Sequence, residues 1–282
     1  MMQIINSHVH MIEVEKALKG LPKSALSKDI TMFQDVDKML GLLKIEILFS
    51  QMERAGVAKS VLFACDAPVI YASNEYVAGL CSKYPDRLIG FASVDPHKKN
   101  AADIIESAIK DLGLKGIKFH PPLQKFYPND KMLFPVYKKA VELNVPVVFH
   151  VGTTPFGAMV RLDQANPILL DEVACEFPEM KIILTHLGTL WHNEAFMVAE
   201  KNPNVYLDTA AYIYEIKQLL TKDTIDRIGH KKFIFGTDYP TSYGEGVHNM
   251  KEFVDCINSL DLPSDIKERI FYKNFQELLL GG

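Results

Sequence analysis

Short runs of β-branched and aromatic residues recur along the chain, and each is followed by a longer stretch with helical spacing of its apolar positions. Most of the short runs are apolar almost throughout, which is typical of parallel strands covered on both faces. They predict eight strands, at residues 3–6, 60–63, 88–93, 116–119, 146–150, 182–185, 205–208 and 233–236. The helical stretches between them predict helices at residues 45–55, 73–83, 101–112, 135–143, 167–177, 194–201 and 250–260.

The distance from one predicted strand to the next is mostly about 30 residues, the size of one strand–helix unit. Eight such units fill the chain, and no linker or shift in composition divides it, so we expect a single domain over residues 1–282. Eight-fold alternation of this kind favours a (β/α)8 TIM barrel. An open doubly wound sheet is the alternative, but the glycine-rich loop expected after its first strand is missing, because the chain reads Asn6-Ser7-His8-Val9-His10 there.

One connection is much longer than the others. Residues 11–44 separate the first predicted strand from the helix that precedes the second. Long connections in compact domains are often functional. We therefore interpret this insertion as a candidate lid over the mouth of the barrel.

Composition and charge narrow the class of protein. Apolar residues make up 48% of the chain and charged residues 23%, a mixture typical of globular proteins and unlike that of disordered ones. The net charge of −4 and the lack of a basic block argue against nucleic-acid or anionic-membrane partners. The four cysteines are scattered, which excludes a disulfide framework or a zinc ribbon. With no signal-peptide pattern and no spanning stretch, we expect a cytoplasmic protein.

Histidine and aspartate side chains stand where the predicted strands end. His8 and His10 are two residues apart, so in an extended chain both point to the same side. His150, His186 and Asp238 end the fifth, sixth and eighth strands. A single histidine at a strand end is often structural, but the carboxyl ends of all barrel strands meet at one mouth. Imidazoles with one carboxylate suit zinc, iron or manganese, so the set predicts a divalent-metal site.

The ordered set of strand-end segments resembles the amidohydrolase superfamily, in particular its second amidohydrolase family of metal-dependent hydrolases and decarboxylases. The matching segments are His8-Val9-His10, Gly116-Ile117-Lys118-Phe119-His120-Pro121, Val148-Phe149-His150, Leu184-Thr185-His186-Leu187-Gly188 and Gly236-Thr237-Asp238-Tyr239-Pro240. They occur in the family's order and span nearly the whole chain. One departure is Asn6, which stands where the family often has aspartate; it alters the support of a ligand and removes none.

The resemblance implies roles for these residues. His8, His10, His150 and Asp238 would bind the main metal ion, with Zn²⁺ the expected ion. Asp238 would also deprotonate the attacking water and pass the proton to the leaving group, and His186 would stabilise the developing oxyanion. In some members of the superfamily a lysine on the fourth strand is carboxylated and bridges two ions. Lys118 and His186 would then join the ligand set, so the expected number of ions is one, or two if Lys118 is modified.

Four further residues are candidates for contact with a small-molecule substrate. Arg161, in the loop after the fifth strand, could hold a carboxylate with two hydrogen bonds. His120, Trp191 and Tyr239 follow the fourth, sixth and eighth strands. Lys125 and Tyr127, after the fourth strand, could form a cationic and aromatic rim with Trp191 and Tyr239, and such a rim suggests an acidic substrate.

Three functions remain open at this point. The first is a metal-dependent hydrolase that uses activated water on a C–N or C–O bond of an amide, lactone or ester. The second is a non-oxidative decarboxylase that uses the same metal site. The third is a non-catalytic, ligand-binding barrel with a structural metal, which would have a closed ligand shell. The resemblance also leads us to expect a homo-oligomer.

Overall fold

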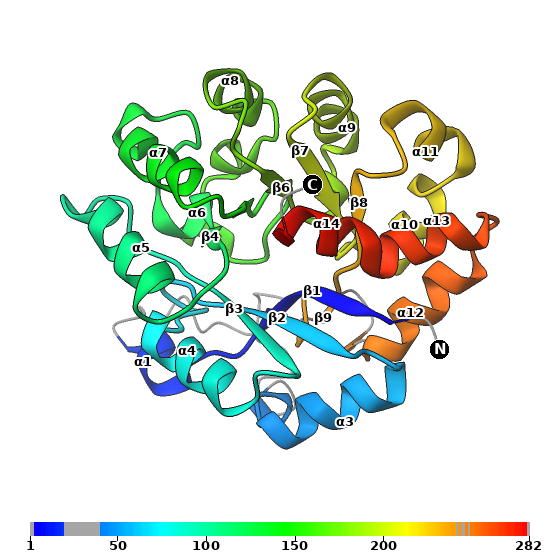
Figure 1. Cartoon of the computed structure of the whole chain (residues 1–282), viewed down its shortest axis with the longest axis horizontal. Helices are drawn as coiled ribbons and strands as arrows, with labels where there is room; N and C mark the ends of the chain where they lie inside the picture. Colours follow the sequence, from blue (N-terminus) through cyan, green and yellow to red (C-terminus); the bar gives the residue numbers. More distant parts are fainter. Residues whose placement is uncertain (1–2, 20–39, 241, 244–245, 248, 281–282) are drawn as a thin grey trace.

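Eight parallel strands lie at the centre of the molecule, with helices arranged around them (Figure 1). The computed structural model describes residues 3–19, 40–240, 242–243, 246–247 and 249–280. The central strands are β1 (Ile5–His10), β2 (Lys59–Phe63), β3 (Leu88–Phe91), β4 (Ile117–Phe119), β5 (Val147–Phe149), β6 (Ile182–Leu184), β7 (Val205–Asp208) and β8 (Phe233–Ile234). Each overlaps one predicted strand, although β1 extends to His10, four residues beyond the predicted end of the first strand. The short β9 (Ser242–Tyr243) and β10 (Gly246–Val247) form a separate antiparallel pair.

The parallel strands follow the order of the sequence, in two sheets of three and five strands that meet at two junctions. At the first, Ala92 after β3 is bridged in parallel to Ile117 of β4. At the second, Val9 of β1 is bridged in parallel to Tyr239 after β8, and the His10 N–H donates to the Tyr239 carbonyl at 2.7 Å. Backbone hydrogen bonds therefore connect neighbours all the way from β1 to β8 and back to β1. The fold is a (β/α)8 TIM barrel, as predicted.

Helices surround the strands, both on the outside of the barrel and at its two ends. They are α1 (Val14–Leu18), α3 (Ile45–Ala55), α4 (Asn74–Lys83), α5 (Ala101–Lys110), α6 (Pro121–Gln124), α7 (Phe134–Glu142), α8 (Leu169–Glu176), α9 (His192–Lys201), α10 (Ile213–Leu219), α11 (Lys222–Ile228), α12 (Met250–Ser259), α13 (Ser264–Glu268) and α14 (Asn274–Leu280). Short turns of 3-10 helix occur at η3 (Lys131–Leu133), η4 (Gly157–Met159), η5 (Leu162–Ala165) and η6 (His186–Gly188), and η7 (Arg269–Lys273) is a π-helical turn. None of the described helices is long and apolar enough to cross a membrane.

Helix α3 shows how the sequence pattern produces this layer. Its buried residues Leu48, Met52 and Ala55 are spaced four and three apart, so they share one face that packs on the core. The helix ends at Gly56, whose φ of +69° is a left-handed conformation that glycine adopts at little cost. The helices α10, α11, α13 and α14 lie outside the predicted stretches, because helices of five to seven residues contain too few turns to show a clear period.

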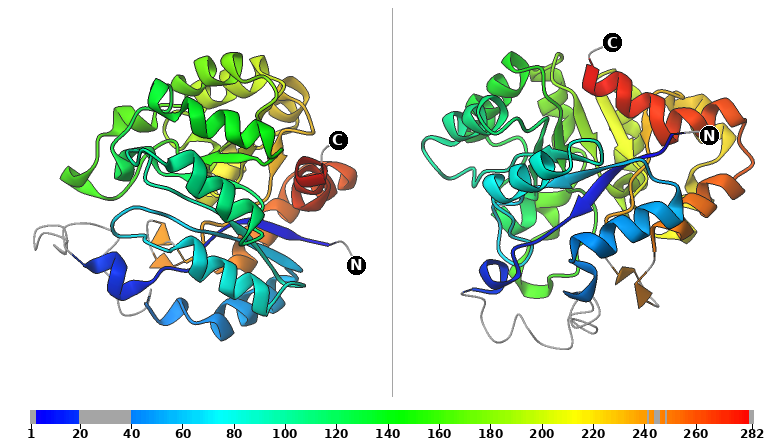
Figure 2. Two further views of the ribbon diagram at one scale, coloured as in Figure 1. Left: turned by 60° about the vertical axis from the view of Figure 1, so that its left-hand side comes forward. Right: turned by 60° about the horizontal axis from the view of Figure 1, so that its bottom comes forward.

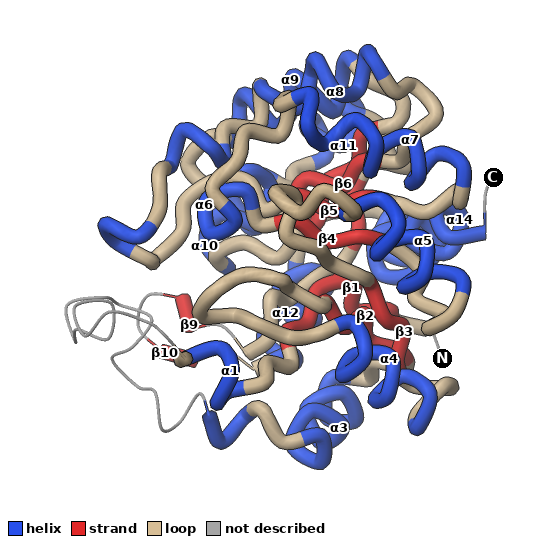
Figure 3. The backbone as a smooth tube through the Cα atoms, turned by 90° about the vertical axis from the view of Figure 1, so that its left-hand side faces the viewer, coloured by secondary structure: helices blue, strands red, loops and turns tan. Residues whose placement is uncertain are grey.

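The inside of the barrel has its own apolar core. Alternate strand residues point inward, among them Val61, Val148 and Ile183, and they form one buried cluster with Phe275 and Leu278 of α14. Figure 3 shows α14 on one side of the barrel, while α1, α6 and α10 lie on the opposite side, and the left view of Figure 2 shows the same for α14 (red) and α1 (dark blue). Helix α14 therefore closes one end of the barrel, and the carboxyl ends of the strands face the other.

The long connection after β1 is described only at its two ends. It begins with α1 and resumes just before α3, while residues 20–39 lie outside the described residues. The prediction of a lid falls largely on those residues.

Candidate metal centre and active site

Three side chains converge at the carboxyl ends of β1 and β8. His8 Nε2 lies 3.2 Å from His10 Nε2 and 3.0 Å from Asp238 Oδ1, and His10 Nε2 lies 3.3 Å from the same oxygen. All three residues are buried, and both histidines come from the extended strand β1. The structure thus brings His8, His10 and Asp238 together in one cluster whose ligand atoms could hold a metal ion.

A second carboxylate, that of Asp208, binds the ring nitrogen of His8 that does not face the cluster. Asp208, the last residue of β7, accepts a hydrogen bond from His8 Nδ1 at 2.7 Å through Oδ2. Its Oδ1 accepts from the backbone N–H groups of His186, at 2.7 Å, and Ala210, at 3.0 Å. Sequence reasoning missed Asp208, although its position at a strand end is the same signal that singled out Asp238.

The charges of these groups depend on one another. Burial alone would raise the pKa of Asp238, but His8 and His10 outweigh burial and hold that pKa well below its usual range. Asp208 is likewise buried, and His8 lowers its pKa. Burial and Lys118 disfavour a charge on His8, yet Asp238 and Asp208 together raise its pKa. The two ionised carboxylates therefore make this cluster a place that attracts positive charge.

The geometry fits a divalent cation. Because neutral His8 donates through Nδ1 to Asp208, its Nε2 carries a lone pair, and that lone pair faces an ionised oxygen of Asp238 at 3.0 Å. In the metal-free protein a proton on Nε2 satisfies this pair, in keeping with the raised pKa of His8, and a divalent cation would take the place of that proton. The spacing of 3.0–3.3 Å among the three atoms also matches that of ligand atoms bound at about 2.1 Å to one metal ion.

His150 and His186 form a second pair beside the cluster. His186 Nδ1 lies 2.6 Å from the Ala210 carbonyl, which can only accept, so neutral His186 has its lone pair on Nε2. That nitrogen then accepts from His150 Nδ1 at 3.1 Å. His150 Nε2 is left as a buried lone pair without a hydrogen-bond partner. His186, His8 and Asp208 form a second group with metal-ligand spacing, whereas His150 belongs to neither group among the described residues.

Lys118 lies inside the barrel on β4. It is fully buried, its Nζ has no hydrogen-bond partner in the described part of the chain, and the ammonium group lies 4.8 Å from the centre of the Phe63 ring. Burial lowers the pKa of Lys118 to about 8, although Asp208 and Asp238 oppose this shift. The amine of Lys118 therefore loses its proton more readily than that of an exposed lysine.

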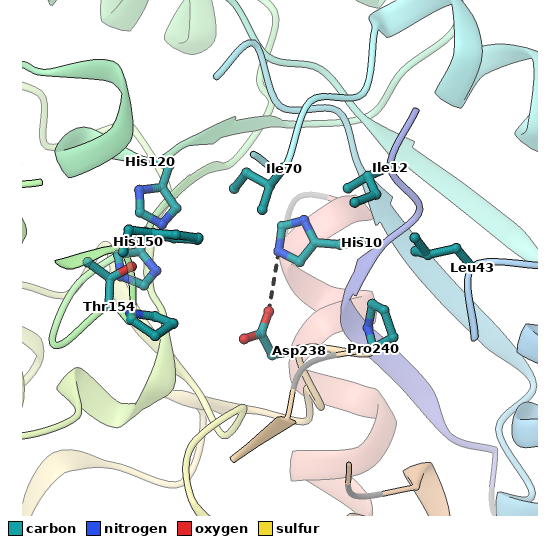
Figure 4. Close-up of a pocket in the computed structure, with 11 residues that line it drawn as sticks. His10, Ile12, Leu43, Ile70, His120, His150, Thr154, Asp238 and Pro240 are labelled. Carbon is teal, nitrogen blue, oxygen red and sulfur yellow. Dashed lines mark ion pairs between the residues drawn. The ribbon is translucent and has the colours of Figure 1, made fainter. Parts of the chain in front are cut away.

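A cavity with a volume of about 590 Å³, counted out to its opening, lies over the cluster of His8, His10 and Asp238 (Figure 4). Several lining residues were not predicted from the sequence, among them Thr154, Ile70 and Phe156. Ile12 and Leu43 belong to the described ends of the long connection, so part of this insertion does reach the cavity. The lining comprises His10, Ile12, Leu43, Ile70, His120, His150, Thr154, Pro155, Phe156, Asp238 and Pro240.

Three of the four predicted substrate contacts lie elsewhere, and only His120 lines the cavity. The side chain of Arg161 is 71% exposed, because Asp163, two residues on, binds its guanidinium group at 2.7 Å. Tyr239 is 2% exposed, donates its hydroxyl to the Leu42 carbonyl at 2.6 Å, and is not among the residues that line the cavity. Trp191 lines a different hollow, together with Leu162 and Leu190. None of the four predicted rim residues, Lys125, Tyr127, Trp191 and Tyr239, is among the residues that line this cavity.

Comparison with known proteins agrees with this architecture. The pattern of a family described as amidohydrolase matches residues 41–279. A 2-keto-4-carboxy-3-hexenedioate hydratase of Sphingobium sp. is 25% identical over 73% of this chain and 70% of its own length. A 2-amino-3-carboxymuconate-6-semialdehyde decarboxylase of Dictyostelium discoideum is 24% identical over 74% of this chain and 63% of its own length.

A solved structure shares the fold over nearly the full length of both chains. It is a 5-carboxyvanillate decarboxylase of Novosphingobium aromaticivorans with bound manganese, and it superposes with a TM-score of 0.76 at 18% identity over 99% of this chain and 97% of that one. The family match covers most of the present chain, including the segment that carries Asp208 and Asp238. The chain therefore belongs to the second amidohydrolase family and is an enzyme of that family.

Proposed function

We propose that this enzyme is a metal-dependent hydrolase that cleaves a C–N or C–O bond of a small, carboxylate-bearing molecule. The observation that supports this most is the position of Asp238. Its carboxylate, with a strongly lowered pKa, contacts the Nε2 atoms of His8 and His10 and lines the cavity. A metal ion bound there would supply a water of lowered pKa and would polarise the bond to be cleaved.

The residues around the proposed metal site have separate roles in this reaction. His8 and His10 would hold the ion, and Asp208 fixes the ring of His8 in the tautomer that a ligand needs. Asp238 takes the proton from the attacking water and passes it to the leaving group. His150 offers a further lone pair next to His186 at the same end of the barrel. The apolar residues around the opening limit access of bulk water.

We propose one ion per chain, with Zn²⁺ as the first expectation. The two residue groups with metal-ligand spacing share His8, and this favours a single ion over two. The manganese in the related decarboxylase makes Mn²⁺ the alternative. A carboxylated Lys118 would instead accompany two ions.

A non-oxidative decarboxylase is the second candidate. The Dictyostelium decarboxylase and the shared fold of the carboxyvanillate enzyme favour it. The flat, parallel rings of His120 and His150, whose centroids are 3.9 Å apart, would suit a planar unsaturated acid. In this reaction the C–C bond to the carboxylate breaks, CO₂ leaves, and Asp238 relays a proton taken from water to the carbon that held the carboxylate, which leaves hydroxide.

Elemental analysis of protein purified without chelator tests the first step of both proposals. A content close to one zinc or manganese ion per chain supports the single site. A content close to two ions per chain would indicate that Lys118 is carboxylated and belongs to the ligand set. A protein that holds no ion after incubation with either metal contradicts the proposal. The loaded enzyme is then assayed on lactones, amides and esters by acid or amine release, and on unsaturated carboxylic acids by CO₂ release. Only the first signal supports the hydrolase, and only the second supports the decarboxylase. A metal-loaded protein inactive on both panels would favour a binding protein.

A further inference from the structure

The cavity has two chemically different walls, which lie on either side of His10 and Asp238. His120, His150 and Thr154 lie on one side, and Ile12, Leu43 and Pro240 lie on the other, with the His10–Asp238 pair between them (Figure 4). The first side, called the polar wall here, also includes Pro155 and Phe156, whose ring packs against His120, so its polar groups are set among apolar ones.

The imidazole of His120 is held in one tautomer by the backbone. His120 is the N-cap residue of α6, and its Nδ1 accepts a hydrogen bond from the Leu123 N–H at 3.3 Å. An accepting Nδ1 carries a lone pair, so the proton of the neutral ring is on Nε2. The backbone of the same residue is fixed too, since its N–H donates to the Gln124 side chain at 2.9 Å. His120 therefore presents a fixed, uncharged donor.

Thr154 supplies a second donor on the same wall. The residue is buried and lines the cavity, yet its hydroxyl oxygen has no hydrogen-bond partner among the described residues. A buried hydroxyl without a partner is costly, because water is lost and nothing replaces it. A ligand atom that accepts a hydrogen bond would remove that cost.

The polar wall selects for an oxygen that can accept hydrogen bonds. Within the described part of the chain, no lysine or arginine lines the cavity. We propose that His120 Nε2–H and Thr154 Oγ1–H bind a carbonyl or carboxylate oxygen of the substrate, which is a planar organic acid whose apolar face rests on Ile12, Leu43 and Pro240. This inference rests on the proposed function only for the placement of the reacting bond over His10 and Asp238.

Binding of benzoate to the zinc-loaded protein tests the proposal, because benzoate combines a planar apolar ring with a carboxylate. The variant His120→Phe keeps a ring to stack on His150 but removes the donor, and His120→Gln restores an N–H. Thr154→Val removes the hydroxyl at nearly constant volume. Thr153→Val is the matched control, since Thr153 lines the separate hollow beside Trp191.

We expect the benzoate Kd to rise about tenfold in His120→Phe and in Thr154→Val, the effect of losing one hydrogen bond to a charged group. His120→Gln should recover part of that loss, and Thr153→Val should bind as the parent does. Metal content is measured for every variant. Unchanged affinity in both test variants at full metal content would overturn the proposal, because benzoate would then be held by the metal alone. Absence of benzoate binding to the parent protein would also overturn it.

Nitrogen NMR of histidine-labelled, zinc-loaded protein gives a second readout that does not depend on turnover. The signal that disappears in His120→Phe identifies His120, and it should show a protonated Nε2 and a bare Nδ1. The opposite tautomer would contradict the proposed donor. If the protein binds no zinc, the proposed function fails, but benzoate affinity and the tautomer can still be measured on the protein as purified.

Discussion

Asp208 Oδ2 accepts a hydrogen bond from His8 Nδ1 at 2.7 Å, while its Oδ1 accepts one from the backbone N–H of His186 at 2.7 Å. One buried carboxylate at the end of β7 thus fixes a candidate metal ligand on β1 and the turn that follows β6. Because the Nδ1 proton is committed to Asp208, the Nε2 lone pair of His8 faces His10 and Asp238.

Loss of the Asp208 charge should weaken metal binding without removing a ligand. In Asp208→Asn we expect zinc affinity to fall about 10–100-fold, the usual effect of changing a group that orients a metal-binding histidine. Competition with a chromogenic chelator measures this. Asp163→Asn, which alters an exposed carboxylate that binds Arg161, is the control and should leave zinc affinity unchanged. Equal affinities in the two variants would remove Asp208 from the support of the site.

Removal of both strand-β1 histidines should abolish metal retention. The double variant His8→Ala, His10→Ala loses two of the three clustered ligand atoms, so we expect elemental analysis to find close to no zinc after gel filtration. His230→Ala, at an exposed histidine remote from the cluster, should retain the parent content. Full retention in the double variant would show that the ion binds elsewhere.

Loss of the Asp238 charge should affect turnover more strongly than it affects folding. Asp238→Asn keeps the shape of the side chain but cannot carry a proton from water to the leaving group. We expect thermal unfolding close to the parent and a decrease in kcat of about 10²–10⁴-fold, the usual contribution of a positioned general base. The assay uses the best substrate from the panel with metal content measured in parallel. A kcat within a factor of two of the parent at equal metal content would exclude this role.

Lys118 should destabilise the metal-free protein at neutral pH. Its pKa is lowered to about 8 in the fold, against about 10.4 in an unfolded chain. Below pH 8 both states are protonated and the cost of the buried charge is complete. Between pH 8 and 10.4 the folded state releases the proton first, so stability rises with pH. Lys118→Met should therefore be more stable than the parent at pH 7, by ~2 kcal/mol, and this difference should shrink at pH 9.5.

Urea unfolding of metal-stripped protein at the two pH values measures this difference. Lys98→Met, at a partly exposed lysine paired with Asp66, is the control and should show no gain at pH 7. A gain for Lys118→Met that is the same at pH 7 and pH 9.5 would mean that charge burial is not its cause.

Gly152 should not tolerate a side chain. Its φ is +90°, and a Cβ there would lie 2.6 Å from the Thr189 carbonyl oxygen, beside the turn that carries His186. We expect Gly152→Ala to lower the free energy of unfolding by about 1–3 kcal/mol. Gly79→Ala, in helix α4 with open space around the new methyl group, should be neutral or gain about 0.5–1 kcal/mol. Chemical denaturation of both variants tests the contrast.

The sequence was most informative where a strand period and a chemical residue type coincide. The two-residue spacing of His8 and His10 predicts one shared side, and their Nε2 atoms are indeed in contact. Asp238 joins them because the last strand pairs with the first, which follows from the barrel order. Most strand positions could be predicted because these strands are nearly continuous apolar runs, whereas β1, which contains Asn6, Ser7, His8 and His10, extends past its predicted end.

Loop residues could not be placed in the same way, because their direction depends on partners far along the chain or on local competition. Tyr239 is not among the lining residues, and its hydroxyl donates to the carbonyl of Leu42, nearly 200 residues distant. Arg161 is occupied by its own neighbour Asp163. Thr154 and Leu43 carry no distinctive chemistry, and only the folded chain shows that they face the same cavity.

The position of helix α14 determines where substrate can enter and product can leave. Phe275 and Leu278 pack against the inward-facing residues of the strands and seal the end of the barrel opposite the cavity. Within the part of the chain that the structure describes, substrate and product would therefore enter and leave at the same end of the barrel, the end that holds the cavity.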